Sequence, residues 1–135
     1  MKILFMCVAN SARSQMAEGL ARTILGPEHE IQSAGSHPSK VNPFAIQAMQ
    51  EIGIDITEHY SKSINELPPE FIGGIDYVIT LCAEEVCPIM TTKAKKLHWP
   101  FLDPATSGVT DEERLTAFRR VCGEIRSRIN EFFPC

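Results

Sequence analysis

A cysteine and an arginine lie six positions apart near the amino terminus, in the stretch CVANSARS at residues 7–14. The apolar run KILFM precedes Cys7 and the amphipathic stretch QMAEGLARTIL follows, which predicts a tight loop between a strand and a helix. Such a loop can direct backbone N–H groups into one concavity, and the start of the helix adds its own. Arg13 adds a planar fork of donors that suits a tetrahedral oxyanion. These features favour the thiolate of Cys7, which could attack the central atom of the bound oxyanion.

The other loop residues fit an oxyanion site. Ser14 can donate its hydroxyl proton to the Cys7 sulfur, and Asn10 tolerates left-handed backbone geometry and can tie the loop together through its amide. The predicted substrate-binding residues are Val8, Ala9, Asn10, Ser11, Ala12, Arg13 and Ser14. The alternative is a buried strand cysteine at Cys7 and a solvated arginine at the start of the helix, because Cys-x5-Arg by itself is a common spacing.

A candidate acid catalyst stands in HWPFLDPA, residues 98–105. Asp103 follows a predicted strand, and Pro104 holds it in an extended loop conformation. A carboxylic acid at the rim of an oxyanion pocket can protonate a leaving oxygen while the thiolate attacks. The alternative is a simple Asp-Pro turn.

Two further cysteines lie in CAEEVCP, residues 82–88. Cys82 follows the apolar run IDYVITL, and Cys87 comes after four intervening residues. This spacing is wider than Cys-x-x-C, so residues 83–86 would have to move or loop out for the two to form a disulfide. Both could instead be core cysteines. A zinc site is not expected because the four histidines are scattered without ligand spacing, and no cofactor is predicted.

Length and composition narrow the class of protein. The 135 residues fit a single domain, 1–135, and the net charge of −4 argues against a nucleic-acid partner. No apolar stretch approaches the roughly 18 residues that a membrane span requires, and the first apolar run is too short for a secretory signal. Five cysteines without such a signal favour a reducing compartment, which predicts a cytoplasmic protein.

Strand and helix patterns alternate along the chain. Strands are predicted at 2–7, 30–34, 75–81 and 95–99, and helices at 14–25, 42–53 and 111–133, with a less regular stretch at 55–74. This order favours an α/β domain with a four-stranded parallel sheet flanked by helices. Ligands bind such sheets at the carboxyl ends of the strands, where Cys7, Cys82 and Asp103 fall.

In combination, CVANSARS, SAG at 33–35 and DP at 103–104 resemble the low-molecular-weight protein tyrosine phosphatase superfamily. More narrowly, NSARSQMAEG at 10–19, GIDIT at 53–57, VITLC at 78–82 and CP at 87–88 resemble the thioredoxin-coupled arsenate reductases built on that fold. The resemblance covers essentially the whole chain. It implies reduction of arsenate to arsenite, thioredoxin as the reductant, and phosphate or sulfate as competing oxyanions.

The resemblance also implies a relay of three thiols. Cys7 attacks arsenic while Asp103 protonates the departing oxygen, and Cys82 then attacks the Cys7 sulfur and releases arsenite. Cys87 attacks Cys82 in turn and leaves a disulfide for thioredoxin. One departure is that relatives usually separate these last two cysteines by six residues, whereas this chain has four.

A second departure concerns a cation site. Some relatives hold a monovalent cation near the loop asparagine and the serine of SAG, with an acidic ligand after the GIDI segment. Here YSKS at 60–63 puts Lys62 at that place, and its ammonium could substitute for the ion. The chain is then expected to show no potassium dependence. The alternative is that Lys62 is a solvated surface lysine.

Two other functions stay open from the sequence. A phosphotyrosine phosphatase would need Cys7, Arg13 and Asp103 but would be indifferent to Cys82 and Cys87. A non-catalytic oxyanion-binding or redox-sensing module would bind anions tightly without turnover. In each case we expect a monomer.

Overall fold

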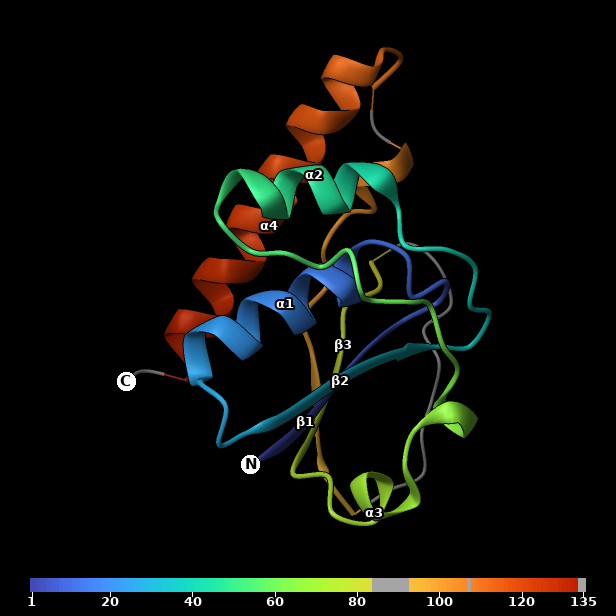
Figure 1. The fold of residues 1–135 in the computed structure, drawn as a ribbon, viewed down its shortest axis with the longest axis vertical. Coiled ribbons are helices and arrows are strands. Elements are labelled where there is room, and N and C mark those ends of the chain that lie inside the picture. The colour runs from blue at the N-terminus through green and yellow to red at the C-terminus, as the bar shows by residue number, and fades with distance from the viewer. Residues whose placement is uncertain (84–92, 107, 134–135) are drawn as a thin grey trace.

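The chain folds around a four-stranded parallel sheet in a computed structural model that describes residues 1–83, 93–106 and 108–133 (Figure 1). The strands are β1 (Lys2–Cys7), β2 (Glu30–Gly35), β3 (Tyr77–Thr80) and β4 (Lys95–His98), in the order β2-β1-β3-β4. The helices are α1 (Arg13–Leu25), α2 (Pro43–Glu51), α3 (Pro69–Ile72) and α4 (Asp111–Phe132), with 3-10 turns η1 (Ile64–Glu66) and η2 (Pro104–Thr106). The predicted α/β class and parallel sheet are confirmed.

The central strand β1 is buried on both faces, and its successive side chains point to opposite sides of the sheet. On β1, Ile3 and Phe5 belong to the larger core, which α1, α2 and α4 cover. Leu4 and Met6 belong to a smaller core with Phe71 of α3. β1 is therefore apolar throughout, as a strand buried on both faces should be, and its carboxyl end delivers Cys7 to one edge of the sheet.

Capping residues explain where the helices α2 and α4 begin. The Asn42 side chain accepts the Phe44 N–H at 2.8 Å, and Pro43 occupies the first turn of α2. Thr110 and Glu113 form the capping box expected from their spacing at the start of α4. In the described part of the chain, no helix is long and apolar enough to cross a membrane.

The largest differences from the expected bounds lie in β3 and at the end of α2. The strand predicted at 75–81 is shorter, because the Asp76 carboxylate takes the Lys2 N–H and the ladder begins at Tyr77. The helix predicted to run to Gly53 ends at Glu51, since Gly53 adopts a φ of 81°. The stretch at 55–74 contains η1 and α3, two short helical segments without the long periodicity that predicts a helix.

Candidate functional site

The loop between β1 and α1 encloses a cavity of about 200 Å³ at the carboxyl edge of the sheet. No side chain caps the first turn of α1, and that turn holds no acidic residue. Its amino-terminal N–H groups therefore remain available to an anion. The cavity is lined by Cys7, Val8, Ala9, Ser11, Ala12, Arg13 and Asp103.

Carbonyl oxygens of this loop bind groups outside the cavity. The Val8 carbonyl accepts the His37 N–H at 2.9 Å, and the Ser11 carbonyl accepts the Asn42 N–H at 2.8 Å. The Asn10 carbonyl accepts hydrogen bonds from two side chains. In a trans peptide the carbonyl and the following N–H point in opposite directions. The N–H groups of Ala9, Ser11 and Ala12 therefore point away from these partners, and the loop can offer them to a tetrahedral oxyanion.

Cys7 lies at the base of the cavity in contact with Ser14. The Cys7 Sγ and Ser14 Oγ atoms are 2.9 Å apart, and both residues are buried. Asn10 has a φ of 49° and donates its amide Nδ2–H to Ser14 Oγ at 2.7 Å. The predicted geometry of Asn10 and the predicted Ser14 contact are therefore present, while the chemical roles of these residues stay predictions.

Arg13 and Asp103 also line the cavity. Arg13 is buried and donates to the Phe101 carbonyl at 2.9 Å, which fixes the side chain under the loop. Its second terminal nitrogen is 4.0 Å from Asp103 Oδ2. The Asp103 side chain is 32% exposed, and its other oxygen accepts the Ala105 N–H at 3.0 Å. This carboxyl group is therefore a partly exposed member of the cavity lining, and its catalytic role stays a prediction.

Cys82 lies two residues beyond β3, in the chain segment next to the loop. Met6 pairs with Thr80, and the Met6 carbonyl accepts the Leu81 N–H at 2.9 Å. Continuing this register sets Leu81 opposite Cys7 and Cys82 one residue further along, in strands roughly 4.8 Å apart. Cys82 is 1% exposed, so the core-cysteine alternative stays open for this residue. The second predicted resolving cysteine, Cys87, lies outside the described residues.

Cys122 contrasts with Cys7. It lies in α4, and its thiol contacts the Met49 sulfur at 3.6 Å. Burial raises the pKa of the Cys122 thiol, and Arg126 opposes this only in part. A thiol that resists ionisation is a poor nucleophile, so Cys122 belongs to the core.

Lys62 is 5% exposed, so the alternative of a solvated surface lysine is wrong. Its ammonium nitrogen is 3.5 Å from the buried carboxylate of Glu18. The same carboxylate accepts the Ser33 hydroxyl at 2.6 Å and pairs with Arg22 at 2.9 Å. A lysine cation therefore stands beside the serine of SAG, at the position that the sequence predicted for it.

Gln15, Glu18 and His59 were not predicted as site residues. His59 Nδ1 lies 3.0 Å from Gln15 Oε1, and His59 Nε2 lies 3.7 Å from a Glu18 oxygen. Burial lowers the pKa of the His59 imidazole; Glu18 partly opposes this, while Arg22 and Lys62 add to it. Gln15 and Glu18 are three positions apart in α1, a spacing that by itself is typical of a solvent-facing polar pair, so the sequence carried no signal for their burial.

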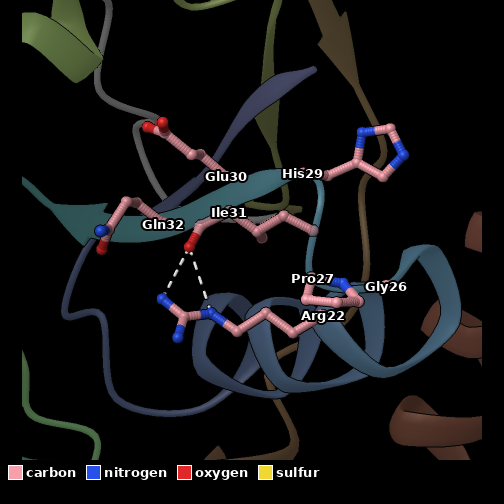
Figure 2. Close-up of a pocket in the computed structure, with 7 residues that line it drawn as sticks. All are labelled: Arg22, Gly26, Pro27, His29, Glu30, Ile31 and Gln32. Carbon is pink, nitrogen blue, oxygen red and sulfur yellow. Dashed lines mark hydrogen bonds between the residues drawn. The ribbon is translucent and has the colours of Figure 1, made fainter.

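A larger cavity lies at the opposite end of β2, against the carboxyl end of α1, and has a volume of about 550 Å³ (Figure 2). Pro27, His29 and Glu30 are among its lining residues. Figure 2 shows the Arg22 guanidinium donating two hydrogen bonds to the Ile31 carbonyl, at 3.2 and 2.7 Å. This cavity contains no cysteine, so the smaller loop cavity is the candidate active site.

Comparison with known proteins finds sequence relatives and structural neighbours of one family. The family model described as low molecular weight phosphotyrosine protein phosphatase matches residues 2–134. An arsenate reductase of Halalkalibacterium halodurans is 47% identical over 96% of this chain and 93% of that protein. The crystal structure of an arsenate reductase from Archaeoglobus fulgidus has a TM-score of 0.79 at 27% identity, covering 97% of this chain and 98% of that one. A thioredoxin-dependent arsenate reductase of Corynebacterium glutamicum has a TM-score of 0.72 at 31% identity, covering 97% of this chain and 59% of that one.

Replacing Gly35 should disrupt the loop. A Cβ atom at this position would overlap the Val8 carbonyl oxygen and lie 2.9 Å from the Asn10 nitrogen. We expect Gly35→Ala to weaken phosphate binding on the order of 100-fold, because displacement of a loop by about 1 Å can cost that much. Protection of Cys7 from alkylation by phosphate measures the binding. Gly123→Ala is the control, since nothing lies within 4 Å of that Cβ position. Unchanged protection in Gly35→Ala would contradict the role of this close approach.

Because Lys62 pairs with Glu18, we expect that neither the stability nor the activity of the enzyme depends on potassium. Replacing sodium by potassium at constant ionic strength should change neither its melting temperature nor its turnover. Lys62→Met should lower the free energy of unfolding, toward the lower end of the roughly 3–5 kcal/mol lost with one partner of a buried pair, because Glu18 keeps Arg22. Urea titration measures this loss. A rise of melting temperature in potassium would show that the lysine does not replace an ion.

His59 should make stability fall in mild acid. Its pKa is lowered in the fold, so the unfolded chain, with a histidine pKa of about 6.5, binds a proton more readily. The free energy of unfolding should then decline as pH falls from about 7 to 5, by at most about 1.4 kcal/mol per pH unit for one proton. In His59→Asn this decline should be shallower. Urea titrations of both proteins at matched pH provide the measurement, and identical slopes would remove His59 from the explanation.

Proposed function

We propose, from the premise that this chain belongs to the low molecular weight phosphotyrosine protein phosphatase family, that it reduces arsenate through a relay of three cysteine thiols. It is an enzyme of the arsenate-reducing branch of that family. The observation that carries the relay is that β1 and β3 are neighbouring parallel strands, so that Cys7 and Cys82 both lie at the carboxyl ends of adjacent strands. Hydrolysis of a phosphate ester does not require a second thiol at that position.

The first step is nucleophilic. Arsenate occupies the cavity with its oxygens on the loop N–H groups and the Arg13 guanidinium. The Cys7 thiolate attacks arsenic and forms a sulfur–arsenic bond, and the bond from arsenic to one arsenate hydroxyl oxygen breaks. Asp103, in its acid form, protonates that oxygen so that it leaves as water.

The second step is the redox step. The Cys82 thiolate attacks the Cys7 sulfur and forms a Cys7–Cys82 disulfide. The electron pair of the sulfur–arsenic bond passes to arsenic, which is reduced from As(V) to As(III) and departs as arsenite. Cys82 is buried, so its sulfur must become accessible for the next exchange.

The third step restores Cys7. Cys87 attacks the Cys82 sulfur, Cys7 leaves as a thiolate, and the Cys82–Cys87 disulfide accepts two electrons from thioredoxin. We include thioredoxin as the reductant because the Corynebacterium relative is described as thioredoxin-dependent. A monomer acting in the reducing cytoplasm is part of the same proposal.

Hydrolysis of phosphomonoesters is the second candidate function. Cys7, Arg13 and Asp103 line the cavity without help from Cys82, and phosphate has the same shape and charge as arsenate. The proposed reductase should therefore retain some hydrolysis of an aryl phosphate. Such activity would not depend on the downstream cysteines.

The deciding experiment measures NADPH consumption after arsenate is added to the protein with thioredoxin and thioredoxin reductase. Cys82→Ser and Cys87→Ser should each abolish sustained turnover, while Cys122→Ser serves as the matched control and should retain it. All variants are also assayed for hydrolysis of an aryl phosphate. No NADPH consumption by the wild type, with equal hydrolysis in all variants, would identify a phosphatase.

A further inference from the structure

The segment between β2 and α2 lies against the loop that forms the cavity (Figure 1). Ser39 donates its N–H to the Ala9 carbonyl at 3.1 Å, and Asn42 donates its N–H to the Ser11 carbonyl at 2.8 Å. Lys40 lies between these two hydrogen bonds. Because Lys40 directly follows Ser39, standard backbone dimensions keep its Cα within about 9 Å of the Ala9 carbonyl oxygen. The backbone therefore holds Lys40 next to the cavity.

The charge of Lys40 is not neutralised by a neighbour. The residue is exposed, and within the part of the chain that the structure describes its ammonium group makes no ion pair or hydrogen bond. Lys40 is not among the residues that line the cavity. Such a charge can act through solvent on an anion that approaches the cavity.

Acidic residues are absent from the sequence around Lys40 and around the loop. Residues 3–17 and 31–50 contain no Asp or Glu, although the whole chain has 17. Arg13 and Lys40 are the Arg and Lys residues of these two ranges. Arg13 lies 4.0 Å from Asp103, so an ionised Asp103 offsets its charge at longer range. Lys40 then supplies the unopposed positive charge of these two segments, in a chain with a net charge of −4.

We infer that Lys40 attracts dianionic oxyanions from solvent and raises their capture by the loop, without contacting them once they are bound. A cation beside a concave site raises the local concentration of an anion and its rate of association. Since the Coulomb energy scales with charge, a dianion gains twice as much as a monoanion, so Lys40 favours the doubly ionised form of arsenate or phosphate. This inference rests on the proposed function only in that a dianion binds in the loop cavity, which hydrolysis also requires.

The test measures the dissociation constant of inorganic phosphate through protection of Cys7 from iodoacetamide. This reagent is uncharged, so Lys40 does not steer the reagent itself. Wild type, Lys40→Gln and Lys40→Glu are compared at a pH where phosphate is mainly a dianion. The ionic strengths are about 0.02 M and about 1 M, at which charges act over roughly 20 Å and roughly 3 Å. Lys95→Gln and Lys95→Glu are the matched controls, because Lys95 is exposed at the start of β4, at the opposite edge of the sheet.

At low ionic strength we expect Lys40→Gln to weaken phosphate binding about threefold and Lys40→Glu about tenfold, as for the loss of one and two charges roughly 10 Å from a dianion in water. At high ionic strength both should lie within about 1.5-fold of the wild type. The Lys95 variants change the net charge equally and should lie within about 1.5-fold at both ionic strengths. In turnover with arsenate at low ionic strength, Lys40→Glu should raise KM and leave kcat unchanged.

Two results would overturn the inference alone. Equal effects of the Lys40 and Lys95 substitutions would show that net charge explains them. Weakening by the Lys40 substitutions that persists at high ionic strength would show that Lys40 acts on the conformation of the loop. Both results require a wild type that binds phosphate, so they leave the proposed reduction standing. Failure of phosphate to protect Cys7 in the wild type would instead overturn the oxyanion site, and with it both this inference and the proposed function.

Discussion

A cavity lined by peptide N–H groups exists only if carbonyl oxygens of the same loop are bound elsewhere. In this protein the donors come from the segment that follows β2, from Ser61 and from Gln15 of α1. β2 must also approach closely enough for these bonds to form, which is why Gly35 has no room for a side chain. Elements without any reactive group therefore determine the shape of the oxyanion site.

Much of this arrangement follows from local patterns in the sequence. The apolar run before Cys7, the amphipathic stretch after it and the caps of the two outer helices each depend on neighbouring residues, so their types and approximate bounds could be predicted. The loop from Cys7 to Arg13 could be predicted for the same reason. Cys82 was expected to close its strand, whereas β3 ends at Thr80 and Cys82 follows two residues later.

The polar network behind the loop could not be predicted in this way. Gln15, Glu18 and Arg22 share a face of α1 that, by spacing alone, would face solvent. Contacts from His59, Tyr60 and Lys62 cover that face, and they come from an irregular segment with no periodicity. Burial of the polar face thus depends on a long-range contact. The same contact explains why Lys62 is buried while most lysines are exposed.

The free edge of β2 shows a further effect of two of these residues. In this strand the backbone groups of alternate residues, Ile31 and Gly35 among them, point away from β1. Arg22 binds the Ile31 carbonyl at one end, and the Lys62 carbonyl accepts the Gly35 N–H at the other. Exposed strand edges are templates for pairing with other chains and hence for aggregation. Arg22 and Lys62, which neutralise Glu18 inside the protein, also shorten the edge on which another strand could add.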